Sequence, residues 1–357
     1  MTSIKDYKTT RGEKRYMVLY RTPDRRSTKK RGFKTKRAAE DWAANNTVQM
    51  NTGSWRPEKA GRVTVNAAVK EWLKVKSASI APGTQSNYTG GVKNIARVTV
   101  LGETYLKDVT PELIEEWASE LSKLVKPKTV RNAFGVLNGT MKRAVRDRRI
   151  ATNPCEGVVL PRVEKNEMVV PTVEDVERIA DAAGDFGDFV RFLAMTGLRW
   201  GELAGLQVQD VNLETGRLYV RRQITEANGK LVHGLPKHGK RRIVPLVEQA
   251  AQITASRIEG KGLDDLVFTT KSGAVLRNQN ARRDWLDEAV KSAGLEGVTP
   301  HDFRHTFASV AIAAGANVKA LQQALGHHSA AFTLDQYGHL FPDDLAGFVN
   351  VMAASFR

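Results

Sequence analysis

Residues 300–340 read PHDFRHTFASVAIAAGANVKALQQALGHHSAAFTLDQYGHL. His301 and Arg304 stand three residues apart, directly after Pro300 and before an apolar-rich run, which is typical of a first helical turn with Pro at its start. Residues at this spacing share one helix face, so the imidazole and the guanidinium can point at one target. The positive end of a helix also favours an anion. The stretch therefore predicts a site for an anionic group.

Two glycines divide this stretch. Gly315 and Gly326 follow apolar periodic runs and are typical of helix ends, so we expect three short helices. His327 follows the second helix, and Tyr337 lies in the third. Two cationic or donor groups and a further histidine suit the binding of a phosphodiester. A tyrosine beside them suits a phenolic nucleophile.

These motifs carry a family resemblance. HDFRHTFAS and ALGHHSAAFTLDQYGH resemble the C-terminal signature of the tyrosine recombinases, the phage integrase family. TGLRWGELAGLQVQDV, residues 196–211, resembles the first catalytic box of that family and puts Arg199 in the position of its first arginine. LPKHGKRRIVPL, residues 235–246, resembles the β-hairpin that carries the catalytic lysine, which would be Lys237. Six positions in the family's order over about 140 residues are far more specific than H-x-x-R alone.

The resemblance implies chemistry at a DNA phosphodiester. Tyr337 would attack the phosphorus and form a covalent 3′-phosphotyrosine. Arg199 and Arg304 would hold the non-bridging oxygens, because guanidinium groups bind phosphate bidentately and stay charged. His301 and His327 would donate to the same oxygens, and His301 could exchange a proton with the Tyr337 hydroxyl.

The remaining polar residues near these motifs have less specific signals. Lys237 would protonate the leaving 5′ oxygen, and Lys240 on the same turn is the alternative. Glu202 is expected either to orient an arginine or to lie on the helix surface. His305 and His328, beside the matched histidines, are expected to be structural. No carboxylate cluster typical of a metal nuclease is present, so we expect neither a metal nor another cofactor.

The composition agrees with a nucleic-acid partner. The chain of 357 residues has a net charge of +16, and its first 60 residues hold 16 Lys and Arg against six Asp and Glu. Such a surface attracts polyanions and loses affinity with salt. The single cysteine excludes an intramolecular disulfide and a Cys-based zinc site. Without an apolar run of roughly 18 to 20 residues or a signal peptide, we expect no membrane partner and a location in the host cytosol or nucleoid.

The expected fold class is mainly α with small antiparallel β elements, in several domains. A basic sheet with strands at 4–9, 14–21 and 31–35 and a helix over 36–50 is predicted first. In lambda-type integrases, which it resembles, such a domain binds arm DNA sites. The expected divisions are an arm-binding domain (1–55), a helical core-binding domain (63–152), a linker (153–170) and a mixed, mostly helical catalytic domain (171–357).

The sequence thus predicts a site-specific recombinase that cuts and rejoins DNA through a Holliday junction. The resemblance implies a homotetramer on double-stranded DNA with core and arm sites, and an arm-binding domain would suit an excision factor and a DNA-bending host protein. A type IB topoisomerase and a non-catalytic DNA-binding regulator are the alternatives. Residues 342–357 have helical apolar spacing, and this tail would pack either on a neighbouring protomer or on its own domain.

Overall fold

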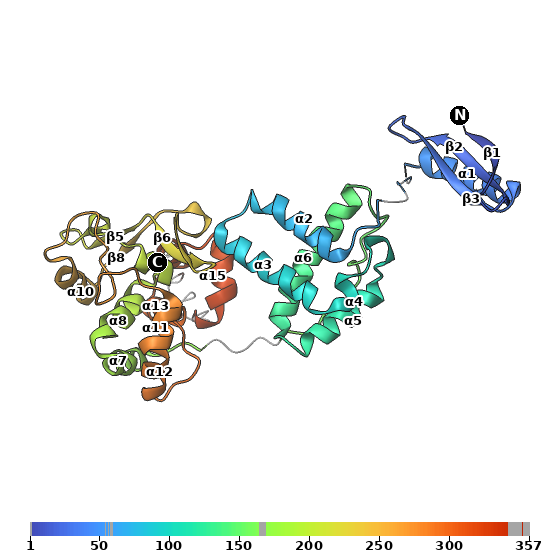
Figure 1. The fold of residues 1–357 in the computed structure, drawn as a ribbon. Coiled ribbons are helices and arrows are strands. Elements are labelled where there is room, and N and C mark those ends of the chain that lie inside the picture. The colour runs from blue at the N-terminus through green and yellow to red at the C-terminus, as the bar shows by residue number, and fades with distance from the viewer. Residues whose placement is uncertain are drawn as a thin grey trace. The chain divides into compact units, whose positions relative to one another are not determined.

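The computed structural model describes residues 2–53, 55, 57, 60–163, 169–341 and 352. The chain divides into two compact units, Met1–Glu164 and Lys165–Arg357. Figure 1 shows the helices and strands of both units, with the colour running along the chain. Helices with small antiparallel sheets make up both units, which confirms the expected fold class. No helix in the described ranges combines the length and the apolar character that crossing a membrane requires.

A three-stranded antiparallel sheet begins the first unit, in the order β1-β2-β3. Its elements are β1 (Ser3–Lys8), β2 (Lys14–Arg21), β3 (Ser27–Phe33) and α1 (Lys36–Asn51). Thr35 caps α1 by accepting a hydrogen bond from the Ala38 N–H at 3.2 Å, and Trp42 of α1 packs edge-on against Tyr20 of β2. The third strand was predicted over 31–35; it exists, but it begins and ends earlier, at Ser27–Phe33. Residues 27–31, which include Lys29, Lys30 and Arg31, also pair with β2, because an edge strand tolerates lysines on its exposed face.

The rest of the first unit is helical. It contains α2 (Val65–Ser77), α3 (Pro82–Arg97), α4 (Thr99–Gly102), η1 (Leu106–Asp108), α5 (Pro111–Ser122) and α6 (Pro127–Arg146). The apolar residues of α6 recur at helical spacing and are buried against α3 and α2. Gly139 lets α6 approach α2 closely, since a Cβ at this position would lie 2.8 Å from the ring of Trp72 in α2. Helix α4 was not predicted, because one turn carries too little periodicity.

The second unit joins helices to two small sheets. Its first part contains α7 (Val173–Ala182), η2 (Gly184–Phe186), α8 (Gly187–Thr196), α9 (Trp200–Ala204), η3 (Val208–Asp210), β4 (Val211–Asn212), β5 (Arg217–Val220), β6 (Gln223–Ala227), β7 (Lys230–Gly234), η4 (Lys237–Gly239) and β8 (Arg242–Pro245). The sheets have the orders β4-β5-β8 and β6-β7. The run over 210–223 has the sequence pattern of one strand, but it forms β4, β5 and the start of β6. Gly216 turns the chain between β4 and β5 at a φ of 58°.

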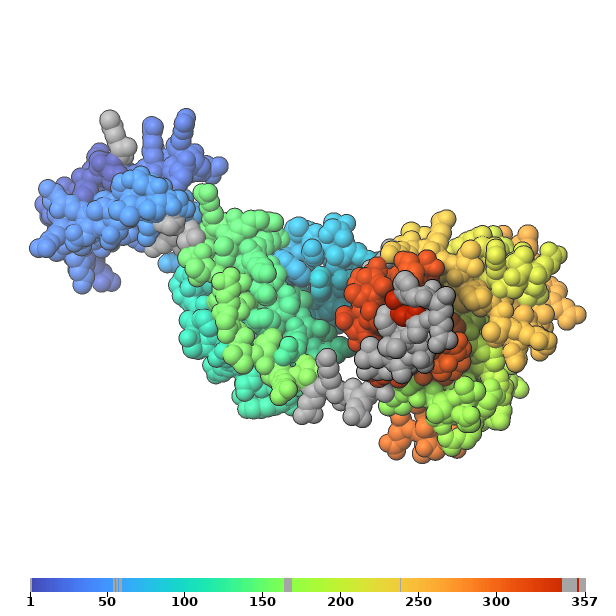
Figure 2. Space-filling model, turned by 180° about the vertical axis from the view of Figure 1, so that it is seen from behind, coloured from blue at the N-terminus to red at the C-terminus, as the bar shows by residue number. Residues whose placement is uncertain are grey.

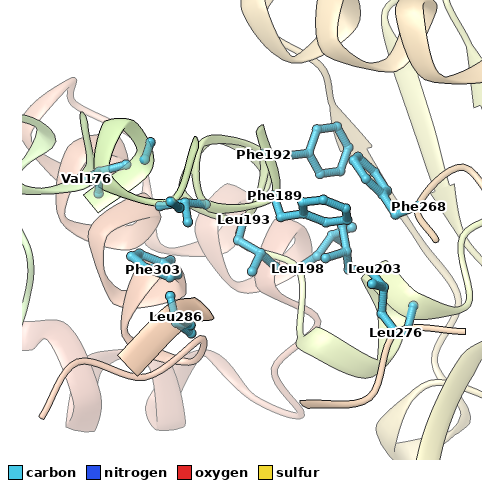
Figure 3. Close-up of a cluster of buried hydrophobic side chains, with 14 of the residues drawn as sticks. Val176, Phe189, Phe192, Leu193, Leu198, Leu203, Phe268, Leu276, Leu286 and Phe303 are labelled. Carbon is cyan, nitrogen blue, oxygen red and sulfur yellow. The ribbon is translucent and has the colours of Figure 1, made fainter. Parts of the chain in front are cut away.

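Buried aromatic and aliphatic side chains hold this unit together. Helices α10 (Glu248–Ile258), α11 (Asn278–Ala281) and α12 (Asp287–Ser292), with a π-turn over Arg282–Leu286, complete its outer part. Figure 3 shows Phe192 and Phe268 beside Phe189, and the Phe192 and Phe268 ring centroids lie 4.6 Å apart. Helix α8 supplies Phe189, Val190, Phe192 and Leu193 to this core and also leads into the turn at Gly197.

Three short helices end the described chain: α13 (Asp302–Ala313), α14 (Val318–Leu325) and α15 (Ala330–Tyr337), followed by η6 (Gly338–Leu340). This confirms the division at Gly315 and Gly326, whose φ angles are 82° and 64°. The first helix starts later than predicted. Pro300 and His301 lie in the preceding turn, where Thr299 donates to the Asp302 carboxylate through its N–H and its hydroxyl, both at 2.7 Å.

Helix α14 packs beside strand β8. In Figure 2 the red C-terminal helices adjoin the yellow surface of the segment that carries the strands. This packing brings the predicted C-terminal stretch, 300–340, beside the predicted hairpin, 235–246. The predicted tail helix over 342–357 lies outside the described residues, except for Met352.

Candidate active site

One cavity of about 340 Å³ in the second unit is lined by all six predicted catalytic residues. They come from five separate places in the fold: the start of α9, the turn between β7 and β8, the start of α13, the end of α14, and the end of α15. These residues are Arg199, Lys237, His301, Arg304, His327 and Tyr337. Residues up to 138 positions apart in the chain, 337 − 199, thus face one space.

Arg304 is the most deeply buried cation of the site, with 1% of its surface exposed. Its guanidinium donates to the carbonyl oxygen of Gly197 at 2.6 Å and to that of Leu325. Burial, and then repulsion from Arg199, lowers the pKa of Arg304 to about 9. The group therefore stays charged at neutral pH, and two carbonyls fix its position rather than an acid that would neutralise it.

Glu202 lies beneath Arg199 and is fully buried, so it is not a residue of the helix surface. Its carboxylate accepts from the Arg199 N–H at 2.9 Å and from the Arg199 Nη1 at 3.0 Å. Burial alone would raise the pKa of Glu202, but hydrogen bonds from Arg242 and the charges of both arginines lower it to about 2. The carboxylate is therefore ionised and orients Arg199 toward the cavity.

Arg242 is a further residue of this network that the sequence analysis did not single out. It donates to both oxygens of Glu202, at 2.8 and 2.7 Å, and through Nε to the carbonyl oxygen of Ala324 at 2.6 Å. The sequence held one indication that Arg242 has a buried partner. In β8, Arg242 shares a face with the buried Val244, because alternate residues of a strand face the same side. A charged residue on the inner face of a strand requires a buried partner.

The two predicted phosphate-binding histidines are neutral in this structure. Burial, followed by the charge of Arg304, lowers the pKa of His327 to about 3, and its Nδ1 lies 2.9 Å from the Thr333 hydroxyl. Burial of the ring, and then the neighbouring His305, lower the pKa of His301 to about 4, although the residue as a whole is exposed. Neutral imidazoles still donate one hydrogen bond each.

Tyr337 is 1% exposed, and its hydroxyl lies 2.7 Å from Nδ1 of His305. Burial raises the pKa of Tyr337 to about 12, against the opposing effect of Arg304. Among the described residues, no hydrogen bond joins His301 to this hydroxyl. His305 was expected to be structural, yet it contacts the Tyr337 hydroxyl; its spacing, one helical turn after His301, was the indication that the sequence held for it.

Lys237 and Lys240 occupy an exposed turn. Only Lys237 of the two lines the cavity, whereas Lys240 donates to the carbonyl oxygen of His328 at 3.4 Å. In the described ranges, no cluster of His, Cys, Asp and Glu side chains is arranged to hold a metal ion.

Comparison with known proteins places this site in a family. Residues 172–343 match the model of the phage integrase family, and residues 5–50 match an arm DNA-binding domain. The chain is 31% identical over 314 residues, 81% of its length, to the integrase of Mycobacterium phage FRAT1, of which 90% is covered. The Tn1549 transposon integrase with circular intermediate DNA has a similar fold (TM-score 0.70, 21% identity, 82% of this chain and 99% of that chain).

A lambda integrase tetramer bound to a Holliday junction is also similar, with a TM-score of 0.62 at 20% identity over 91% of this chain and 96% of that chain. The resemblance carried by the sequence motifs is thereby confirmed. The chain belongs to the phage integrase family and is a tyrosine-type site-specific DNA recombinase.

Proposed function

We propose that this cavity holds one DNA phosphodiester and that Tyr337 breaks it. The tyrosine oxygen forms a bond to phosphorus, and the 5′ oxygen leaves, so that a 3′-phosphotyrosine and a free 5′-hydroxyl result. Arg199 and Arg304 hold the non-bridging oxygens, and His301 and His327 donate N–H groups to them. The observation that carries the proposal is the single cavity lined by a tyrosine and two guanidiniums.

Lys237 is proposed to protonate the leaving 5′ oxygen, since it is the lysine of its turn that lines the cavity. The phosphotyrosine link conserves the energy of the broken bond, so a 5′-hydroxyl from a second duplex can rejoin the strand without ATP. We propose that four protomers do this in pairs on two DNA sites. The lambda integrase tetramer on a Holliday junction supports this arrangement. An excision factor and a DNA-bending host protein are proposed further partners.

The proposed division of labour follows the chain. Residues 1–55 bind arm sites and 63–152 bind core sites, with 153–170 as the linker and 171–357 as the catalytic domain. The arm-domain match at 5–50 supports the first, and the boundary between the compact units at 164/165 falls inside the linker. Action on DNA also supports a location in the host cytosol or nucleoid.

A nicked suicide duplex tests the reaction. The duplex carries a core site selected by binding from random DNA, and its nick lets the fragment next to the cut diffuse away. Wild type is expected to become covalently attached to a DNA 3′ end on a denaturing gel, whereas Tyr337→Phe is not. A two-site assay then separates a recombinase from a topoisomerase. Absence of an adduct on a specifically bound duplex would favour a non-catalytic regulator.

A further inference from the structure

The nucleophile has a partner that its proposed role does not yet use. The Tyr337 hydroxyl and Nδ1 of His305 are 2.7 Å apart, and both side chains are buried. The tyrosine comes from the end of α15 and the histidine from the second turn of α13, with ring centroids 5.6 Å apart. Two elements therefore place a basic nitrogen directly on the reacting oxygen.

The tyrosine needs such a group. Burial raises the pKa of Tyr337 to about 12, so that roughly one hydroxyl in 10⁵ is ionised at pH 7. The nearby arginines lower this pKa but do not overcome burial. Attack at a useful rate therefore requires a base that removes the proton as the bond to phosphorus forms.

The surroundings of His305 keep it in its basic form. Burial lowers the pKa of His305, Arg304 lowers it further, and Asp302 opposes them. The ring of His301 stands edge-on to that of His305 at 5.1 Å, and Tyr337 faces it from α15. The net effect lowers the pKa below its usual value, so the imidazole is neutral at pH 7 to 8 and a ring nitrogen can accept a proton.

We propose that His305 is the general base that takes the Tyr337 proton during cleavage and returns it during rejoining, an inference that rests on the proposed function. The proton of the hydroxyl moves to Nδ1 as the oxygen bonds to phosphorus and the 5′ oxygen leaves. On rejoining, a 5′-hydroxyl attacks the phosphorus, and the departing tyrosine oxygen recovers the proton from the His305 imidazolium. The resting His305 carries its proton on Nε2.

His301, the histidine that the family motif suggests for this exchange, is differently placed. It precedes α13, is exposed, and makes no hydrogen bond to Tyr337 in the part of the chain that the structure describes. The geometry leaves His301 free to donate to the phosphate while His305 acts on the tyrosine. His301 thus acts on the phosphate, and His305 acts on the tyrosine hydroxyl.

The test compares His305→Asn, His305→Ala and the matched variant His301→Asn on the suicide duplex across pH 5.5–9.5. The Asn oxygen occupies nearly the place of Nδ1 and accepts a hydrogen bond, but it is not a base. We expect both His305 variants to form adduct about 10²-fold to 10⁴-fold more slowly. The wild-type rate should level off above the pKa of His305, while the His305→Asn rate keeps rising with hydroxide about tenfold per pH unit.

A substrate with sulfur at the 5′ bridging position adds a second readout. A thiolate leaves without a proton, so this substrate should restore cleavage by Lys237→Ala but not cleavage by His305→Asn. His301→Asn should slow cleavage while keeping the wild-type pH profile. If His305→Asn retained the wild-type rate and pH profile, the residue would only hold the tyrosine in place, and the inference would be wrong.

Folding and the proposed function are checked separately. Melting and core-site binding show whether the His305 variants are intact, and nitrogen NMR of ¹⁵N-histidine-labelled wild type reports the tautomer without any mutation. A proton on Nδ1 rather than Nε2 would overturn the inference. Failure of wild type to form any adduct would overturn the proposed function together with it, whereas a wild-type adduct with an unaffected His305→Asn variant overturns this inference alone.

Discussion

Arg242 and Glu202 form a buried, two-armed ion pair, with N–O distances of 2.8 and 2.7 Å. The pair joins β8 to α9, and the third donor of Arg242 reaches Ala324 at the end of α14. The segments that carry Lys237, Arg199 and His327 therefore meet at one guanidinium. Because both side chains are buried, neither can be changed without leaving the other uncompensated.

We expect Glu202→Gln to destabilise the protein. The substitution keeps the shape of the side chain but leaves two arginines without their anion, at a cost of about 3 to 5 kcal/mol in the free energy of unfolding. Urea unfolding measures this. Glu214→Gln, at an exposed turn, is the matched control and should cost less than about 0.5 kcal/mol. Equal stability of the two variants would mean that the buried pair contributes nothing.

The same carboxylate predicts a pH dependence. Its pKa is about 2 in the folded protein against 4.5 ordinarily, so its contribution is complete above pH 4.5 and lost as the pH falls toward 2. The contribution is about 3 kcal/mol. The stability difference between wild type and Glu202→Gln should thus shrink over this window, while losses from His301 and His327 begin near pH 6.5 in both proteins. A difference that stays constant down to pH 2.5 would contradict this.

Gly326→Ala should damage the site more than its backbone conformation alone explains. Its φ is 64°, and an added Cβ would lie 2.9 Å from Cδ of Arg242. Gly315 has a φ of 82° with open space around it, so Gly315→Ala carries only the conformational cost of about 1 kcal/mol. We expect Gly326→Ala to lose more stability and also to slow adduct formation, measured on the suicide duplex. Similar effects of both variants would argue against a tight contact between Gly326 and Arg242.

The two lysines of the η4 turn should differ in cleavage. Lys237→Ala removes the proposed proton donor and is expected to slow adduct formation by about 10²-fold or more. Lys240→Ala removes a 3.4 Å contact to a carbonyl at an exposed position and should change the rate less than threefold or so. Single-turnover cleavage rates decide between them. A larger loss in Lys240→Ala would reassign the role.

The sequence allowed part of this site to be predicted, for identifiable reasons. Local motifs that resemble those of the family marked Arg199, Arg304 and Tyr337, because each motif is a short run of adjacent residues that can be read without knowing the fold. The role of Arg242 depends on partners about 40 and 80 residues away. A single sequence indicates such long-range pairings only weakly, here through the alternation of residues in β8. His305 was underestimated for the same reason, since its hydrogen bond spans 32 residues.

The way Arg304 is held has a consequence for how this protein tolerates change. Both of its recorded acceptors are main-chain carbonyls, those of Gly197 and Leu325. Every amino acid brings the same carbonyl, so sequence drift at the accepting positions cannot delete the acceptor as it could delete a side-chain acid. Only a shift in the course of the backbone can withdraw it. The central cation of the site is thus anchored to the fold itself.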